Sequence, residues 1–317
     1  MKDYYKMKIN DLIFKELIKR GYKIEGKKRV WDIADSKLWY LTPKQAQGFL
    51  DLSKTEGYKK SIIDKEVFLI KKYMKDFIHA LPKDSCNLID LGCGDGKKAS
   101  LFIEELAKHM KIRYCPVDIS SYMVSKAAKT IREMRVGEVL EFKWNISDFE
   151  NLDNVTPLFR DKGFETHFMM LLGNTLGNFD REDILHGIKN SMNKDDVLII
   201  GNGLTNGHED WTREYKDQII NNWLIQVPQQ INLTEEDIDY DVRFVNSRIE
   251  EIYIVNKEKT INHLGKAVNF KRGDIIITAI SYKYTLLEFE KLISNFFSFV
   301  KIYTDKDKTY ALALCKK

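Results

Sequence analysis

Three glycines and one acid form the pattern in this sequence that most clearly indicates a ligand-binding site. Gly92, Gly94 and Gly96 fall at alternate positions after a short apolar run, and helical spacing begins directly behind them. Such a loop lets a ligand approach the backbone where a Cβ would block it, close to a helix N-terminus. Asp118 ends a second apolar run, where an acid can accept both ribose hydroxyls of a nucleoside. The pattern predicts a nucleoside-cofactor site.

The spacing of the glycines distinguishes two cofactor classes. The dinucleotide pattern G-x-G-x-x-G needs its third glycine at position 97, which is Lys97 in this chain. The observed G-x-G-x-G spacing favours the loop of class I methyltransferases. The alternative interpretation is a plain strand-to-helix turn, in which the glycines only relieve crowding and Asp118 is solvated.

Two later loops follow predicted strands at the same edge of the sheet, where open α/β folds bind ligands. Asp148 is placed to accept from an adenine amino group with Phe149 beside the ring, although an ordinary capping turn explains the pair equally well. Residues 173–179 hold two glycines and two amides before a helix that Asp180 can cap. Asn178 in that loop is either a ligand contact or a turn residue in the left-handed conformation.

Strands and helices alternate from residue 87, which predicts an α/β fold with a parallel, doubly wound sheet. Strands are expected near 87–91, 112–118, 138–144, 165–172 and 196–201, with helices near 97–109, 120–134 and 180–192.

The flanking segments have a different character. Residues 1–80 show helical spacing with no strand expected, and aromatic residues within 31–58 are more often packing than ligand contacts. After residue 204 we expect a lid with a helix at 212–226 and a hairpin at 242–255. The chain then continues with a strand at 275–284, a helix at 286–296, and two segments that close the sheet antiparallel, 299–303 and 310–314.

Composition excludes several classes of protein. The net charge is +4 from 51 basic and 47 acidic residues without a massed basic patch, so we expect no nucleic-acid partner. No stretch approaches the ~20 apolar residues that span a bilayer, so we expect no membrane segment and a cytoplasmic location. The six histidines never fall at metal-ligand spacing and the four cysteines form no C-x-x-C pair, so we expect no metal and reduced thiols.

Several short segments occur in the order typical of one enzyme family: LGCGDGKK (91–98), YCPVDIS (114–120), SDF (147–149), LLGNTLGNF (171–179), ITAISYKYT (277–285) and YALAL (310–314). Through them most of the chain resembles the S-adenosylmethionine-dependent histidine Nα-methyltransferases of ergothioneine synthesis, and the related tryptophan and dimethylallyltryptophan N-methyltransferases.

The resemblance implies a Rossmann-like class I methyltransferase domain, assigned to 60–204 and 282–317, and a smaller α+β substrate-binding lid domain, assigned to 1–59 and 205–281. The cofactor contacts it implies are Gly92, Gly94, Lys98, Asp118, Asp148 and Phe149. It implies that Asn178 and Tyr215 hold the amine and α-carboxylate of an amino-acid substrate, with Tyr40 lining that pocket.

Two positions depart from the histidine-specific pattern. The strand position that carries a glutamate in those enzymes is Ala279, although Ser281 two residues later is kept. A second pocket tyrosine corresponds to Lys59, beside Tyr58. An imidazole would lose its charged partner, and an unsatisfied buried polar group costs about 1–3 kcal/mol. We therefore predict that histidine is a poor substrate and that the pocket takes an apolar, aromatic or acidic side chain.

The predicted function is S-adenosylmethionine-dependent N-methylation of an amino acid or a similar small molecule, which yields S-adenosylhomocysteine. In-line transfer to a neutral amine needs orientation rather than a metal or a covalent nucleophile. Two alternatives stay open, namely a methyltransferase acting on another small amine or a peptide N-terminus, and a non-catalytic protein that binds S-adenosylmethionine. A monomer is favoured.

Overall fold

The computed structural model describes residues 9–81, 84–140, 149–161, 163–207, 210–263 and 265–317. The chain forms two compact units. We call residues 1–49 and 210–282 the small unit, and residues 50–209 and 283–317 the large unit. The predicted division at 59/60 therefore differs from the observed one by ten residues, and Tyr58 and Lys59, expected in the lid domain, belong to the large unit.

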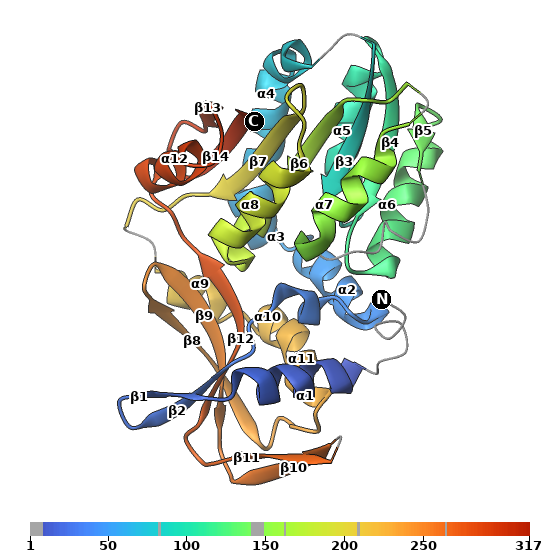
Figure 1. The fold of residues 1–317 in the computed structure, drawn as a ribbon. Coiled ribbons are helices and arrows are strands. Elements are labelled where there is room, and N and C mark those ends of the chain that lie inside the picture. The colour runs from blue at the N-terminus through green and yellow to red at the C-terminus, as the bar shows by residue number, and fades with distance from the viewer. Residues whose placement is uncertain (1–8, 82–83, 141–148, 162, 208–209, 264) are drawn as a thin grey trace. The chain divides into compact units, whose positions relative to one another are not determined.

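The large unit contains a seven-stranded sheet in the order β13-β14-β7-β6-β3-β4-β5 (Figure 1). The strands are β3 (Ser85–Leu91), β4 (Lys111–Val117), β5 (Glu138–Val139), β6 (His167–Leu171), β7 (Val197–Gly203), β13 (Phe299–Thr304) and β14 (Tyr310–Lys316). Strands β3 to β7 pair in parallel, whereas β14 pairs antiparallel with both β7 and β13. The strand order reverses between β3 and β6, so the crevice beyond their carboxyl ends is the expected ligand site.

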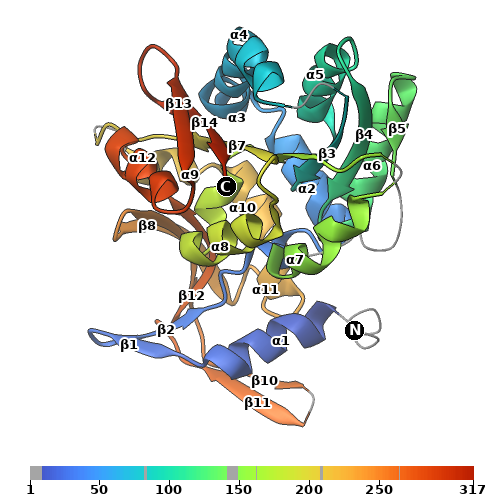
Figure 2. The same cartoon turned by 45° about the horizontal axis from the view of Figure 1, so that its top comes forward.

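Helices cover both faces of this sheet. The main ones are α4 (Asp64–Ala80), α5 (Lys97–Leu106), α6 (Ser121–Glu133), α8 (Arg181–Ser191) and α12 (Leu286–Ser294). The large unit also contains the short helices α3 (Glu56–Tyr58) and α7 (Leu152–Val155). Figure 2 shows α4 and α5 on one face and α7 and α8 on the other. Strands covered on both faces need apolar side chains at nearly every position, and all five residues of β6 are buried.

These elements confirm the predicted parallel α/β sheet. The five predicted strands are present, as are the helices predicted near 97–109, 120–134 and 180–192. Strand β5 covers only Glu138–Val139, and residues 141–144 of the predicted third strand lie outside the described residues.

The small unit is built on a five-stranded sheet in the order β1-β2-β12-β9-β8, beside a separate ribbon of β10 and β11. Its strands are β1 (Lys23–Glu25), β2 (Lys28–Asp32), β8 (Ile238–Val245), β9 (Arg248–Val255), β10 (Lys259–His263), β11 (Lys266–Phe270) and β12 (Ile275–Tyr282). Its helices include α1 (Ile9–Arg20), α9 (Trp211–Tyr215), α10 (Gln218–Leu224) and α11 (Gln226–Gln229), and α2 (Pro43–Leu52) begins in it.

Two expectations for this unit were wrong. Residues 1–80 contain the β1–β2 hairpin, because Gly26 turns the chain at φ 60° and β2 gains a parallel partner in β12, which local sequence does not reveal. The helix expected at 212–226 is three short helices. Asp217 accepts a hydrogen bond from the Ile219 N–H and so starts a new helix there.

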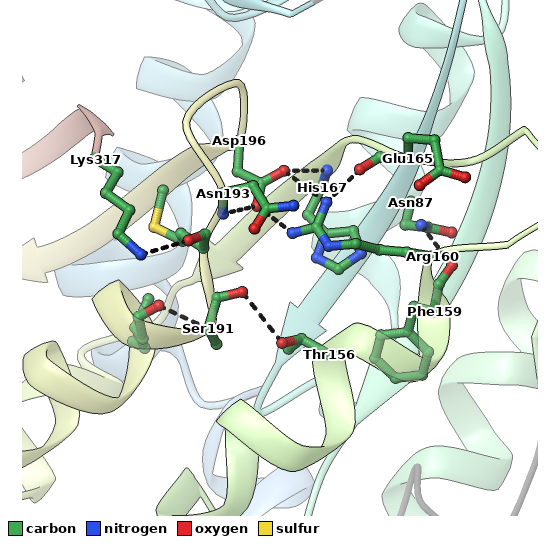
Figure 3. Close-up of polar contacts among 12 residues, drawn as sticks. Asn87, Thr156, Phe159, Arg160, Glu165, His167, Ser191, Asn193, Asp196 and Lys317 are labelled. Atoms are coloured by element: carbon green, nitrogen blue, oxygen red, sulfur yellow. Dashed lines mark hydrogen bonds and ion pairs between the residues drawn. The ribbon is translucent and has the colours of Figure 1, made fainter.

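A buried polar network supports the amino-terminal end of β6 (Figure 3). The Asp196 carboxylate accepts hydrogen bonds from the His167 N–H at 2.7 Å and the Asn193 N–H at 2.6 Å, and pairs with Arg160. The His167 ring is fully buried, and neither ring nitrogen has a hydrogen-bond partner among the residues described. Burial, with the positive charges of Arg160 and Arg113, lowers the pKa of His167 to about 3.

We expect His167→Leu to make the protein less sensitive to acid. A histidine with a lowered folded-state pKa binds its proton more readily in the unfolded chain, so its stabilising effect is lost as pH falls below about 6.5. Between pH 7 and pH 5 the free energy of unfolding should fall by about 2 kcal/mol less in the variant than in the original protein. Urea unfolding at both pH values measures this, with the half-exposed His109→Ala as control. Equal pH dependence in all three proteins would contradict it.

Candidate functional site

The glycine loop after β3 has the backbone geometry that its sequence predicts. Gly92, Gly94 and Gly96 have φ values of 71°, 54° and 76°, a region that favours glycine. A Cβ on Gly92 would lie 3.7 Å from both Phe149 and Thr175, so this glycine lies at the carboxyl edge of the sheet. A Cβ on Gly96 would lie 2.9 Å from the Ala127 Cα, so that glycine allows α5 to pack against α6.

Asp118 lies against the same loop. It follows β4, is 8% exposed, and accepts hydrogen bonds from the Ser120 N–H at 2.9 Å and from the N–H groups of Gly94 and Ile119. Burial raises the pKa of Asp118 to about 6, against the lowering effect of these backbone donors. The structure thus brings Asp118 to the glycine loop and does not leave it solvated as the alternative interpretation required.

Phe149 lies at the other side of the loop. Its ring centroid is 5.2 Å from that of Phe179, and its edge is 3.7 Å from the Cβ position of Gly92. An aromatic face is therefore available beside the glycines, as an adenine ring requires. Asp148, the predicted partner of the adenine amino group, lies outside the described residues.

Lys98, in the first turn of α5, has a partner that the sequence interpretation missed. Its Nζ donates to Glu66 Oε2 at 2.8 Å. Glu66 shares the buried face of α4 with Ile70, Met74 and Phe77, so an acid within an apolar helical stripe was the available signal. A Cβ added to Gly173 would lie 2.6 Å from Lys98 Nζ. The ammonium group therefore lies close to the backbone at the start of the loop after β6.

A third buried acid, Asp90 on β3, lies near this ion pair. The Tyr114 hydroxyl donates to it at 2.9 Å. Burial raises the pKa of Asp90 to about 7, whereas the Tyr114 hydrogen bond and the charge of Lys98 lower it. The carboxyl edge of the sheet therefore combines buried acids with the ammonium group of Lys98.

The loop at 173–179 is held by hydrogen bonds to α4 and β7. The Gly173 N–H donates to Glu66 Oε1 at 2.9 Å, and Asn174 Oδ1 accepts from the Gly203 N–H at 2.6 Å. The loop has positive φ at Gly173 (74°) and at Asn174 (66°), whereas Asn178 ends a 3₁₀ turn, η7 (Thr175–Asn178). Asn178 is therefore not the left-handed turn residue that one interpretation proposed.

Three of the expected substrate residues lie in the small unit, two on β12 and one at the end of α9. Ser281 and Ala279 are buried on β12, and the Tyr215 hydroxyl, at the end of α9, is 3.5 Å from Ser281 Oγ. The Tyr240 hydroxyl donates to the Tyr215 carbonyl at 2.9 Å, which fixes α9 against β8. The structure thus brings together Tyr215 and Ser281, which are 66 residues apart in the sequence.

Glu251 on β9 is a buried acid that was not predicted for this face. It is 5% exposed and stands directly opposite Ala279 in the antiparallel pairing of β9 with β12. Directly opposite residues share a face of the sheet, so Glu251 lies on the side that carries Ala279 and Ser281. β12 has no acid at Ala279, and the neighbouring strand supplies one on the same face, which the sequence interpretation did not anticipate. Two acids inside an otherwise apolar strand, Glu250 and Glu251, were the available signal.

The remaining expected residues belong to other elements. Tyr40 belongs to an aromatic cluster of the small unit, with its ring centroid 5.4 Å from that of Phe49 and 5.7 Å from that of Trp223. These contacts agree with the packing role that the sequence favoured for the aromatic residues of this segment. In the large unit, Tyr58 ends α3 and the exposed Lys59 begins a π-helical turn, η3 (Lys59–Ile63).

The described part of the chain contains neither a metal site nor a membrane-spanning helix. No group of three or more His, Cys, Asp or Glu side chains is arranged to hold a metal ion there. Within the same residues, every helix is too short or too polar to cross a bilayer.

Comparison with known proteins gives matches in both sequence and structure. Ergothioneine biosynthesis protein 1 of Schizosaccharomyces pombe is 23% identical over 145 residues, which are 44% of this chain but only 19% of that protein. Similar solved structures include an S-adenosylmethionine-dependent methyltransferase from Clostridium acetobutylicum, with 15% identity over 84% of this chain and 94% of that one, and a TM-score of 0.40. Human N-acetylserotonin methyltransferase in complex with S-adenosylmethionine has 13% identity over 87% of this chain and 55% of that one, with a TM-score of 0.41.

A family model also matches this chain. The family model described as "Histidine-specific methyltransferase, SAM-dependent" matches residues 47–317, which include the whole seven-stranded sheet. The fold is accordingly the Rossmann-like fold of class I methyltransferases, and the cofactor is S-adenosylmethionine. Because the match spans most of the chain, this protein belongs to the histidine-specific family of S-adenosylmethionine-dependent methyltransferases.

Proposed function

We propose that this methyltransferase modifies the amino group of a free amino acid or an amino-acid-like small molecule. The observation that carries the proposal is the approach of Tyr215 to Ser281 on the small unit's sheet, since both occupy positions that hold the amino-acid substrate in the resemblance described above. A small-molecule acceptor in the cytoplasm and a monomeric enzyme are part of the same proposal, and the small net charge of +4 argues against a nucleic-acid acceptor.

The residues at the carboxyl edge fit each part of the cofactor. Gly92 and Gly94 leave the backbone open, and the buried Asp118 would accept the two ribose hydroxyls. Phe149 offers a ring face to adenine, and Lys98 offers its ammonium group to the α-carboxylate. When bound, S-adenosylmethionine supplies an electrophilic methyl group on a sulfonium.

The chain's own contribution to the transfer is orientation. An α-amino group has a pKa near ~7.7–8.0, so a useful neutral fraction exists at physiological pH without a dedicated base. Asn178 and Tyr215 would hold the amine and carboxylate of the acceptor, so that the nitrogen lone pair points at the methyl carbon from about 3–3.5 Å.

We propose that histidine is a poor acceptor, because β12 carries Ala279 where the histidine-specific pattern has an acid. A second candidate is favoured by Glu251, whose buried carboxylate on the same face could accept from an imidazole or another donor-bearing side chain. The two candidates differ in which strand supplies the acid, so variants at the two positions separate them.

Asp118→Ala should weaken binding of S-adenosylhomocysteine by roughly 1.5–3 kcal/mol, about ten- to a hundredfold, because two ribose hydroxyls lose a charged acceptor. Isothermal titration calorimetry measures this. Asp95→Ala removes the same charge from the same loop and should bind normally. Unchanged affinity in a folded Asp118→Ala protein would remove the site assignment.

Asn178→Ala should lower kcat strongly with little change in S-adenosylhomocysteine affinity, because Asn178 is assigned to the acceptor amine and not to the nucleoside. Initial rates over a range of acceptor concentrations, combined with calorimetry, measure both quantities. An equal loss of turnover and cofactor affinity would mean that Asn178 only shapes the loop.

Ala279→Glu should raise kcat/KM for histidine about tenfold or more, because a charged contact is worth on the order of 1.5–3 kcal/mol. The second candidate expects instead that the unaltered protein already methylates histidine and that Glu251→Gln removes this activity. Rates with a panel of amino acids, measured for the three proteins, decide between them. Histidine methylation by the unaltered protein at the rate of its best other acceptor would refute the first candidate.

A further inference from the structure

A fully buried carboxylate lies beneath the proposed cofactor site. Glu66 is 0% exposed and shares its face of α4 with Ile70, Met74 and Phe77. Burying a charge among apolar side chains is unfavourable unless hydrogen bonds and an opposite charge compensate for it. The partners of Glu66 therefore show what the group does in the folded protein.

One oxygen of Glu66 is fixed by the sheet. Oε1 accepts from the Gly173 N–H at 2.9 Å and from the Tyr310 hydroxyl at 2.5 Å. A Cβ at position 201 on β7 would lie 2.2 Å from the same oxygen, so the absence of a side chain at Gly201 makes room for the carboxylate. Residues from β7, β14 and the loop after β6 thus hold the carboxylate in one orientation.

The other oxygen faces Lys98. Oε2 accepts from Lys98 Nζ at 2.8 Å, and the lysine side chain is 31% exposed although its partner is wholly buried. An ammonium group carries three donors, so Lys98 keeps donors for a ligand at the surface. A lysine side chain loses rotamer entropy when it is fixed, and a partner that fixes it in advance lowers the cost of binding.

We propose that Glu66 is a positioning residue for the cofactor, holding the Lys98 ammonium group in place to receive the α-carboxylate of the methionine portion. The inference rests on the proposed cofactor site, in which Lys98 meets that carboxylate. Glu66 itself does not touch the ligand. Its effect should therefore be confined to ligands that carry the amino-acid tail.

Two ligands that differ only in this tail test the inference. S-adenosylhomocysteine carries the amino-acid tail, whereas 5′-methylthioadenosine has the nucleoside and the sulfur without it. In Glu66→Gln, a substitution of nearly equal size, affinity for S-adenosylhomocysteine should fall about tenfold or more, and affinity for 5′-methylthioadenosine should stay within about twofold. Calorimetry with both ligands gives the ratio. Equal loss for the two ligands, or no loss for either, would overturn the inference.

Two further variants keep the test decisive. Tyr310→Phe removes a donor to Oε1 but leaves the Lys98 pair, so it should keep the affinity ratio of the original protein within about twofold. If Glu66→Gln does not fold, Glu66→Asp keeps the charge but draws it back from Lys98 Nζ, and it should show the same selective loss. A folded Glu66→Asp protein with the original affinity for both ligands would refute the role.

The affinity test of Glu66 and the proposal of an amino-acid acceptor can fail independently. A protein that binds both ligands with the expected ratios but methylates no amino acid would refute the proposed acceptor and support the role of Glu66. A protein that methylates an amino acid while Glu66→Gln affects both ligands equally would support the proposed function and refute the role of Glu66.

Discussion

The ion pair between Glu66 and Lys98 is the interaction on which the carboxyl edge of the large unit depends. A carboxylate buried among apolar side chains has to find donors, and here they come from α5, β14 and the loop after β6. The same contacts explain two glycines, since a Cβ at Gly173 would meet the lysine and one at Gly201 would meet the glutamate. Satisfying one buried charge therefore fixes several elements of the site at once.

The small unit depends on a different constraint, the pairing of strands that are distant in the sequence. Strand β12 lies between β2 and β9, parallel to the first and antiparallel to the second. The pairing is irregular between Ile277 and Ala279, and from Ala279 onward the register places Glu251 opposite Ala279 and Ile249 opposite Ser281. The polarity of this face thus depends on side chains from both β9 and β12, and the residue at position 279 does not determine it alone.

Much of the large unit could be predicted because its signals are local. The run Leu88–Leu91 and its glycines indicate a buried strand and a ligand loop within a dozen residues, and the place of Asp118 follows from the parallel order of strands. Local sequence could not decide whether Asn178 is a ligand contact or a left-handed turn residue. The choice depends on which residues of its loop are left-handed, and Asn174 takes that conformation while its side chain bonds to Gly203 on β7.

The sequence by itself determined the parallel α/β sheet, the glycine loop and the acid at the end of the second strand, because apolar periodicity and glycine spacing act over short distances along the chain. Only the tertiary structure decided that β2 joins the small unit's sheet, that Glu66 holds Lys98, and that Glu251 faces Ala279. Each of these contacts joins residues at least 28 positions apart. No local pattern encodes which distant donor a buried carboxylate will meet, since that choice depends on how the whole chain packs.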